Sequence, residues 1–155
     1  MLSDDVYQTR LRTTVTALEQ WLTGLRAVAS IETARDAASW RVAITPHVVE
    51  GCPLELVLRT DRQFDFSVGP ETYEDQAVDT LDTFQPLLEA IAAGKVKTCR
   101  WSTAATGNLV RVATRVAPDG GARWQRSRAI GLFGWTNAAN LIRSDRHYAP
   151  YARGA

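Results

Sequence analysis

The chain has 155 residues, of which 45% are hydrophobic and 23% charged, values that are ordinary for one soluble globular domain. No stretch approaches the ~18 consecutive apolar residues of a membrane helix. The N-terminal MLSDDVYQTRLRTT lacks the basic start and apolar run of a secretory signal. We therefore expect a single α+β domain over residues 1–155, cytoplasmic and without a membrane contact, whose last few residues fray.

The charge of the chain is unevenly distributed although its net value is only +1. Residues 1–96 hold eight Lys or Arg and fifteen Asp or Glu, a balance of −7, whereas residues 97–155 hold ten and two, a balance of +8. Such asymmetry is typical of a site for nucleic acid or another polyanion, or of an acidic part that folds back onto a basic one. All bases except Lys95 and Lys97 are arginine. That bias indicates either bidentate phosphate and carboxylate contacts or genome composition.

A long amphipathic helix is expected near the N-terminus, where Ser3 or Asp4 can cap it. Its apolar residues recur with alternating spacings of four and three, at Leu11, Val15, Leu18, Leu22, Leu25 and Ala29. A helix that lies on a sheet explains this pattern. A helix that also pairs with a second subunit is the alternative. Residues 31–39 continue the helix or form a turn.

Three strands with alternating apolar residues follow, over residues 40–45, 54–58 and 64–68. The acidic stretch 71–82, ETYEDQAVDTLD, is expected to be a solvated surface, or a hard-cation site if its carboxylates converge in space. A second helix is expected to begin near residue 83, because Pro86 must lie close to its first turn. Gly94 is suited to end it.

The stretch 97–135 carries three of the five tryptophans and predicts a meander of strands over 96–103, 109–116 and 123–132. Pro118-Asp119-Gly120-Gly121 is the strongest turn signal in the chain. Thr136 can cap a short C-terminal helix over residues 137–143. The expected fold is thus one antiparallel sheet of about six strands in the order α-βββ-α-βββ. The two main helices lie on one face of this sheet.

The meander also contains the candidate anion-binding residues. With a three-residue loop, Thr114 would face Trp124, and Trp124 would share a side of the hairpin with Val112, Arg126 and Arg128. The opposite side would then carry Arg111, Arg115 and Arg123. A loop of two or four residues would shift the register by one and reverse the partners across the hairpin. These arginines either cover apolar surface with their stems or form a face that binds phosphate.

Other chemistry has little support in the sequence. His47 and Cys52 are close enough to suggest a catalytic pair, and His47, Glu50 and Cys52 a metal site, but neither spacing matches a known motif. The phosphate-binding motif G-x-x-x-x-G-K and the nucleophile motif G-x-S-x-G are absent. Cys52 and Cys99 are expected to be buried and unpaired. We therefore predict no catalytic residue, no metal site and no cofactor.

These patterns favour a non-catalytic domain that acts through self-association, as a homodimer, or by binding a protein partner. Nucleic-acid or other polyanion binding through the arginine face is the alternative. A further alternative is a ligand-binding or enzymatic pocket between sheet and helices, lined by Trp40, Phe66 and Trp101.

Overall fold

The computed structural model describes residues 3–120, 123–130 and 140–152. The first half of the chain forms, in order, α1 (Asp4–Leu25), β1 (Ala29–Arg35), β2 (Ser39–Pro46), β3 (Leu54–Arg59), β4 (Gln63–Val68) and β5 (Glu71–Ala77). The second half forms the short 3-10 helix η1 (Leu81–Thr83), α2 (Phe84–Ala92), β6 (Val96–Thr103), β7 (Leu109–Val116), β8 (Trp124–Ala129) and β9 (Leu141–His147).

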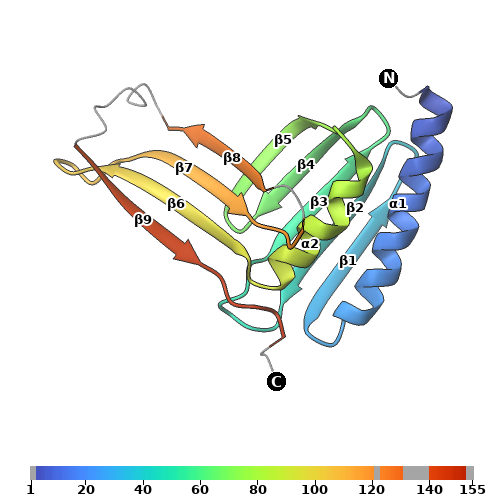
Figure 1. Cartoon of the computed structure of the whole chain (residues 1–155), viewed down its shortest axis with the longest axis horizontal. Helices are drawn as coiled ribbons and strands as arrows, with labels where there is room; N and C mark the ends of the chain where they lie inside the picture. Colours follow the sequence, from blue (N-terminus) through green and yellow to red (C-terminus); the bar gives the residue numbers. More distant parts are fainter. Residues whose placement is uncertain (1–2, 121–122, 131–139, 153–155) are drawn as a thin grey trace.

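The strands make two antiparallel sheets, which diverge from each other in Figure 1. The first sheet has the order β1-β2-β3-β4-β5 and the second the order β8-β7-β6-β9. The α+β class and the antiparallel pairing are confirmed. The single sheet of about six strands and the order α-βββ-α-βββ are wrong, because three strands were not expected.

The three unexpected strands all lie at sheet edges, where backbone pairing and not burial of apolar side chains defines a strand. β1 pairs with β2 along its whole length but buries only Ala29. β5 carries most of the acidic stretch, and β9 pairs with β6 over residues 141–147. The expected helix over 137–143 is therefore wrong for residues 141–143. Thr136 and residues 137–139 lie outside the described part of the chain.

Helix α1 covers the first sheet with most of the stripe that its sequence predicts, but it ends at Leu25, and Ala29, expected on the same stripe, begins β1. The helix or turn expected over residues 31–39 is therefore wrong for residues 31–35. Ser3 caps α1 by accepting a hydrogen bond from the backbone N–H of Val6. Five side chains of the helix are buried, namely Tyr7, Leu11, Val15, Leu18 and Leu22. The stripe is thus already covered within the chain, and a second subunit would have to bind elsewhere.

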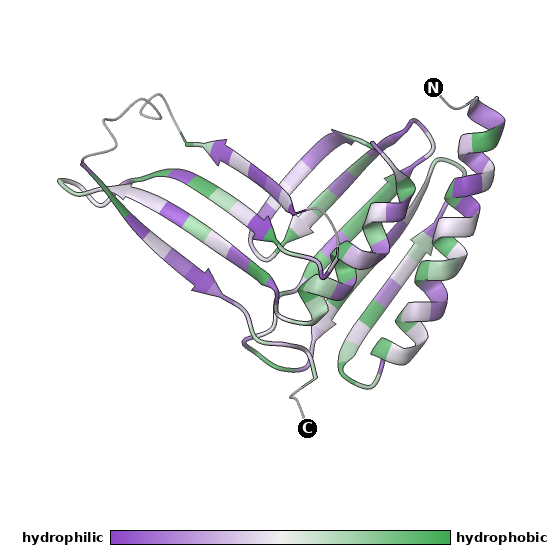
Figure 2. Ribbon diagram, in the orientation of Figure 1, coloured by the Kyte–Doolittle hydropathy of each residue, from purple (hydrophilic) through white to green (hydrophobic). Residues whose placement is uncertain are grey.

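The main core lies between this sheet face and both helices. Alternate residues of β2, β3 and β4 point into it, namely Trp40, Val42, Ile44, Leu54, Leu56, Leu58, Phe64, Phe66 and Val68. Phe84 of α2 meets Phe64 edge to face, with ring centroids 5.0 Å apart. Trp124 of β8 meets Phe66 in the same way at 5.3 Å, so the second sheet also contributes to this core. Figure 2 shows the hydrophobic residues concentrated in β2 to β4 and α2, while β9 is largely hydrophilic.

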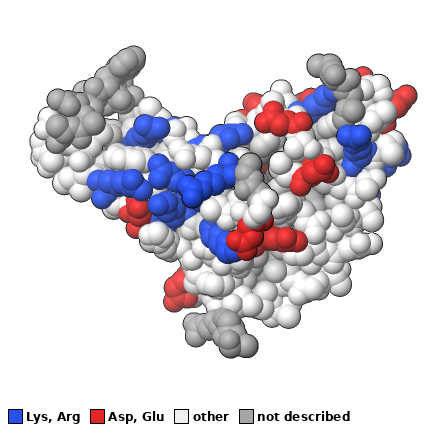
Figure 3. Space-filling view, in the orientation of Figure 1, with Lys and Arg blue, Asp and Glu red and all other residues white. Residues whose placement is uncertain are grey.

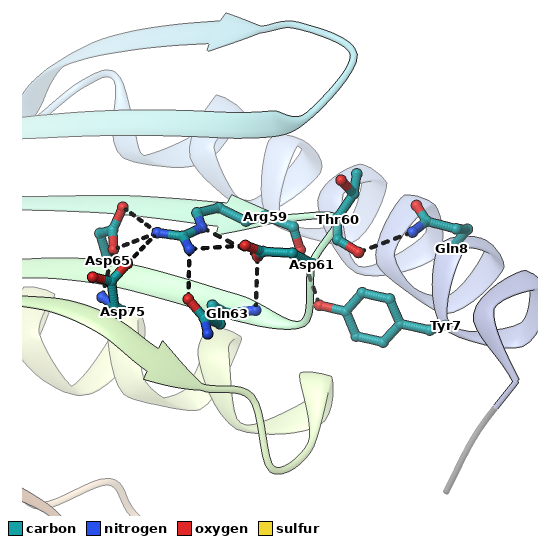
Figure 4. Close-up of polar contacts among 8 residues, drawn as sticks. All are labelled: Tyr7, Gln8, Arg59, Thr60, Asp61, Gln63, Asp65 and Asp75. Carbon is teal, nitrogen blue, oxygen red and sulfur yellow. Dashed lines mark hydrogen bonds and ion pairs between the residues drawn. The ribbon is translucent and has the colours of Figure 1, made fainter.

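Three acidic residues on or beside the first sheet bind one arginine. Asp61, Asp65 and Asp75 lie 2.8, 3.2 and 2.7 Å from the guanidinium of Arg59 (Figure 4). Hydrogen bonds from Arg59 lower the pKa of Asp61. The described residues contain no group of three or more His, Cys, Asp or Glu side chains arranged to hold a metal ion. Apart from Glu71, the acids of residues 71–82 are exposed, which confirms that this stretch is a solvated surface.

The C-terminal segment contacts both halves of the chain. Its two tyrosines, Tyr148 and Tyr151, are buried. The backbone N–H of Tyr151 donates to the carbonyl of Ala92 at 2.8 Å, and its hydroxyl donates to the carbonyl of Cys52. Packing of the first part of this tail is confirmed, whereas the expected fraying falls on residues 153–155, outside the described residues.

Candidate anion-binding face

The register of the β7–β8 hairpin determines on which side of the second sheet each of its arginines lies. Val116, and not Thr114, lies opposite Trp124, so the connection is longer than the three residues expected. The beginning of this connection contacts the neighbouring α2–β6 connection. Ala117 N–H donates to the carbonyl of Lys95 at 3.0 Å, and the Lys95 ammonium pairs with Asp119. The register differs by two residues, which leaves every side chain on the side that parity predicts.

One side of the second sheet packs against the first sheet, and two of its arginines bind there. Arg128 binds the carboxylate of Glu71 through two nitrogens, at 2.6 and 3.3 Å. This hydrogen-bonded pairing raises the pKa of Arg128. Arg126 donates to the side chain of Gln76 at 2.9 Å. Both arginines are therefore structural, and they join the acidic part of the chain to the basic part.

A buried hydrogen bond fixes the same contact between the sheets. The Tyr73 hydroxyl and the Thr114 hydroxyl lie 2.7 Å apart, and Thr114 is completely buried. Burial raises the pKa of Tyr73. The ring of Tyr73 also meets Trp124 edge to face at 5.7 Å.

The opposite side of the second sheet, which we call the basic face, is arranged in three rows across the four strands. Pairing in register defines each row. The end row contains Gln125, Arg115, Lys97 and His147. The middle row contains Ser127, Ala113, Cys99 and Asp145. The tryptophan row contains Ala129, Arg111, Trp101 and Arg143. Neither described helix lies over this face (Figure 1).

In the tryptophan row two arginines flank one indole ring. The guanidinium carbons of Arg111 and Arg143 lie over the Trp101 ring, 5.4 and 5.6 Å from its centroid. Arg111 also donates to the Ser127 hydroxyl at 3.2 Å. These contacts hold the guanidiniums in place, which reduces the side-chain entropy that they lose when they bind a ligand.

The middle row is shielded from solvent by the two flanking rows. Cys99 and Ala113 are completely buried, because the long side chains of the flanking rows cover them. Arg143 donates to the Cys99 sulfur at 3.4 Å and to the Asp145 carboxylate at 2.8 and 3.0 Å. The Arg143 hydrogen bonds hold the pKa of Asp145 at about 2. Asp145 is the one acid in the three rows, and Arg143 already binds it.

The cationic side chains of the end row make few ion pairs among the described residues. Lys97 approaches Asp145 at 3.8 Å, a long ion pair. Among the described residues nothing accepts a hydrogen bond from the buried Nε of Arg115. Arg123, just before β8, is exposed and has no described ion-pair partner. Figure 3 shows Lys and Arg side chains gathered over the second sheet with few acids among them.

The candidates Arg111, Arg115 and Arg123 therefore stay on the uncovered side, but not as one cluster. Arg115 and Arg123 line the same pocket at one end of the sheet. Arg111 lies four residues from Arg115 along β7, about 13 Å away. Sequence reasoning missed Lys97, Arg143 and His147, which join the face from β6 and β9. The alternation of Arg143, Asp145 and His147 was the available signal.

The other sequence candidates do not assemble into a site. Burial raises the pKa of the Cys52 thiol to about 12, so it does not supply a thiolate at neutral pH beside the exposed His47. Cys52 and Cys99 are both buried and unpaired, as predicted. Trp40 and Phe66 are buried in the main core, whereas Trp101 lies on the basic face, so the three do not line one pocket.

Comparison of the chain with protein-family models, with curated proteins and with solved structures gave no match. Within the described residues, neither helix has the length and apolar character that crossing a bilayer requires.

Proposed function

We propose that this chain is a binding protein that engages single-stranded nucleic acid through the basic face. The observation that carries the proposal is the tryptophan row, in which Arg111 and Arg143 lie over Trp101 on a side of the sheet that no described helix covers. Single strands are bound by a positively charged surface that follows the backbone, together with planar side chains on which bases stack. Guanidinium planes serve as such stacking surfaces.

The charge of the face supports a polyanionic partner. Its three rows hold four Lys or Arg side chains and one acid, and Arg123 adds a further charge at the end of the sheet. On the other side, Arg128 and Arg126 are bound by Glu71 and Gln76, whereas the exposed Arg100 and Arg146 add cationic charge there. Four phosphate contacts would give a log–log salt dependence of affinity of about −3 for a single strand.

The test is the anisotropy of a fluorescently labelled single-stranded oligonucleotide, titrated with protein at several salt concentrations. The double variant Arg111→Gln/Arg115→Gln should bind at least 10-fold more weakly at low salt, with a slope smaller by about 1–2. The matched control is Arg10→Gln/Arg12→Gln, which removes the same charge from the exposed side of α1. Equal loss in both double variants would show that net charge and not this face determines binding.

A protein partner is the second candidate, and the charge division of the chain favours it. The basic second sheet of one copy is complementary to the exposed acids of the first sheet of another, which would give a head-to-tail homodimer. Analytical ultracentrifugation tests this, because such a dimer dissociates as salt rises. Polyglutamate serves as the competitor in the anisotropy experiment. If it displaces the oligonucleotide at equal charge concentration, the face binds polyanions without preference for nucleic acid, and the nucleic-acid proposal fails.

A further inference from the structure

A pocket of 410 Å³ opens at the end of the basic face, where β6 to β9 meet the α2–β6 and β7–β8 connections. Lys97, Arg115 and His147 reach it from the end row, Trp124 from the start of β8, and Lys95 and Arg123 from the two connections. The volume lies within the range of small-molecule sites. No Asp or Glu is among the described residues that line it.

Two donors at this pocket lack acceptors within the described part of the chain. The Nε of Arg115 and the Nε1 of Trp124 are both buried, and neither donates a hydrogen bond. Buried N–H groups are almost always paired, and an unpaired one is destabilising. The orphan Nε of Arg115 therefore favours an acceptor-rich group that binds beside it, whereas the Trp124 ring packs against Phe66 and Tyr73 on the other side of the sheet.

Two acids pair with the lysines that line the pocket, and none pairs with its arginines within the described residues. Asp119 is paired with Lys95. Asp145 is held by Arg143 at 2.8 Å and lies 3.8 Å from Lys97. Neither Arg115 nor Arg123 has an ion-pair partner in the described residues. The pocket thus offers two free guanidiniums and one weakly paired ammonium.

We propose that this pocket binds a phosphate monoester group. A monoester carries about −1.5 to −2 charges at neutral pH and has three acceptor oxygens, whereas a carboxylate has one charge and two oxygens. Two guanidiniums match the phosphate in geometry, and the surrounding charge matches its dianion. Because the pocket is larger than phosphate alone, the group belongs to a larger ligand or to the end of a strand. In the second case the inference rests on the proposed function, since the end row then receives the terminal phosphate of the bound nucleic acid.

The test is isothermal titration calorimetry of the full chain with three probes. These are inorganic phosphate, a 5′-phosphorylated oligonucleotide, and the same oligonucleotide with a 5′-hydroxyl. Inorganic phosphate should bind at one site. Arg123→Gln and Arg115→Gln should each weaken its binding at least 10-fold, whereas the charge-matched control Arg12→Gln leaves it unchanged. Arg123 is exposed and lies outside the strands, so its substitution tests the site even if Arg115→Gln unfolds the sheet.

The outcomes separate this inference from the proposed function. Preference for the 5′-phosphorylated strand, lost in Arg123→Gln, supports both. If phosphate binds in an Arg123-dependent manner but neither strand binds, the pocket takes a phosphorylated small molecule and the nucleic-acid proposal fails. If both strands bind equally and phosphate does not, the pocket inference is overturned while the face proposal stands. Phosphate binding that is unchanged in Arg123→Gln also overturns the inference.

Discussion

Replacement of Gly94 by alanine tests how much the close packing of the C-terminal tail against the α2–β6 connection limits substitution there. Gly94 has φ = +78°, and an added Cβ would lie 2.8 Å from the backbone nitrogen of Pro150 and 3.0 Å from the carbonyl carbon of Ala149. Gly107 has a similar φ of +71°, but nothing lies within 4 Å of its Cβ position. The two glycines therefore share the conformational requirement and differ only in the close approach of the tail.

The structure gives the expected difference between the two variants. A residue with a Cβ in the left-handed conformation costs about 1–2 kcal/mol, which both variants incur. A backbone contact under 3.0 Å adds an overpacking cost of about 1–3 kcal/mol, which only Gly94→Ala incurs. We expect the free energy of unfolding to fall by about 2–5 kcal/mol for Gly94→Ala. For Gly107→Ala we expect a decrease of about 1–2 kcal/mol.

Urea unfolding followed by circular dichroism measures both values, and the slope m should stay unchanged if the fold is intact. The melting temperature should fall by roughly 2–4 °C for each kcal/mol in a chain of this size. Equal destabilisation of Gly94→Ala and Gly107→Ala would refute the reasoning, because it would show that the tail does not press against the α2–β6 connection.

Three further sets of substitutions test separate parts of the fold. Gly24→Ala, at an exposed position of α1 with nothing within 4 Å, should raise the free energy of unfolding by about 0.5–1 kcal/mol; a decrease would contradict a regular helix there. Tyr73→Phe and Thr114→Val should each lower the free energy of unfolding by about 1–2 kcal/mol. Their double variant should lower it by about 1 kcal/mol less than the sum of the two, and additive losses would exclude the direct hydrogen bond. The pKa of Asp145 is depressed to about 2, chiefly by Arg143, so its carboxylate stabilises the fold above the unfolded pKa of about 4 and loses this effect as pH falls to 2. The stabilities of wild type and Asp145→Asn should thus converge over that pH window, and a constant gap would show that the carboxylate is not bound.

The parts of the fold that depend on apolar periodicity could be predicted from the sequence. The α1 stripe and the alternation in β2 to β4 both mark side chains that enter the core, and burial of those side chains is what selects their periods. Gly94 at the end of α2 was predictable for the same kind of local reason, since its positive φ favours glycine.

The edge strands could not be predicted from that signal. β1, β5 and β9 are held by backbone hydrogen bonds to β2, β4 and β6, so their outward side chains are free to be polar. The failure to predict β9 also affected the prediction of the basic face. Because residues 141–143 were expected in a helix, Arg143 and His147 could not be placed beside Trp101 and Lys97.

The faces of the hairpin could be predicted for the three-residue loop, whereas a two- or four-residue loop would have reversed them, and the register itself was wrong. Parity separates Arg111 and Arg115 from Arg126 and Arg128, and a shift of two residues preserves this separation. Sequence could not show that Glu71 binds Arg128, because that contact joins two sheets from distant parts of the chain. It also could not show that Arg115 and Arg123 share a pocket.

The central claim is that single-stranded nucleic acid binds on the basic face of the second sheet, and amide chemical-shift mapping by NMR tests it most directly. The 17.1 kDa chain is well suited to ¹H–¹⁵N spectra during titration with an oligonucleotide. We predict shifts that saturate with the added strand and concentrate on residues 97–101, 111–115 and 143–147. Saturating shifts confined to α1 or to β1 to β5, or no shifts at low salt, would contradict the claim.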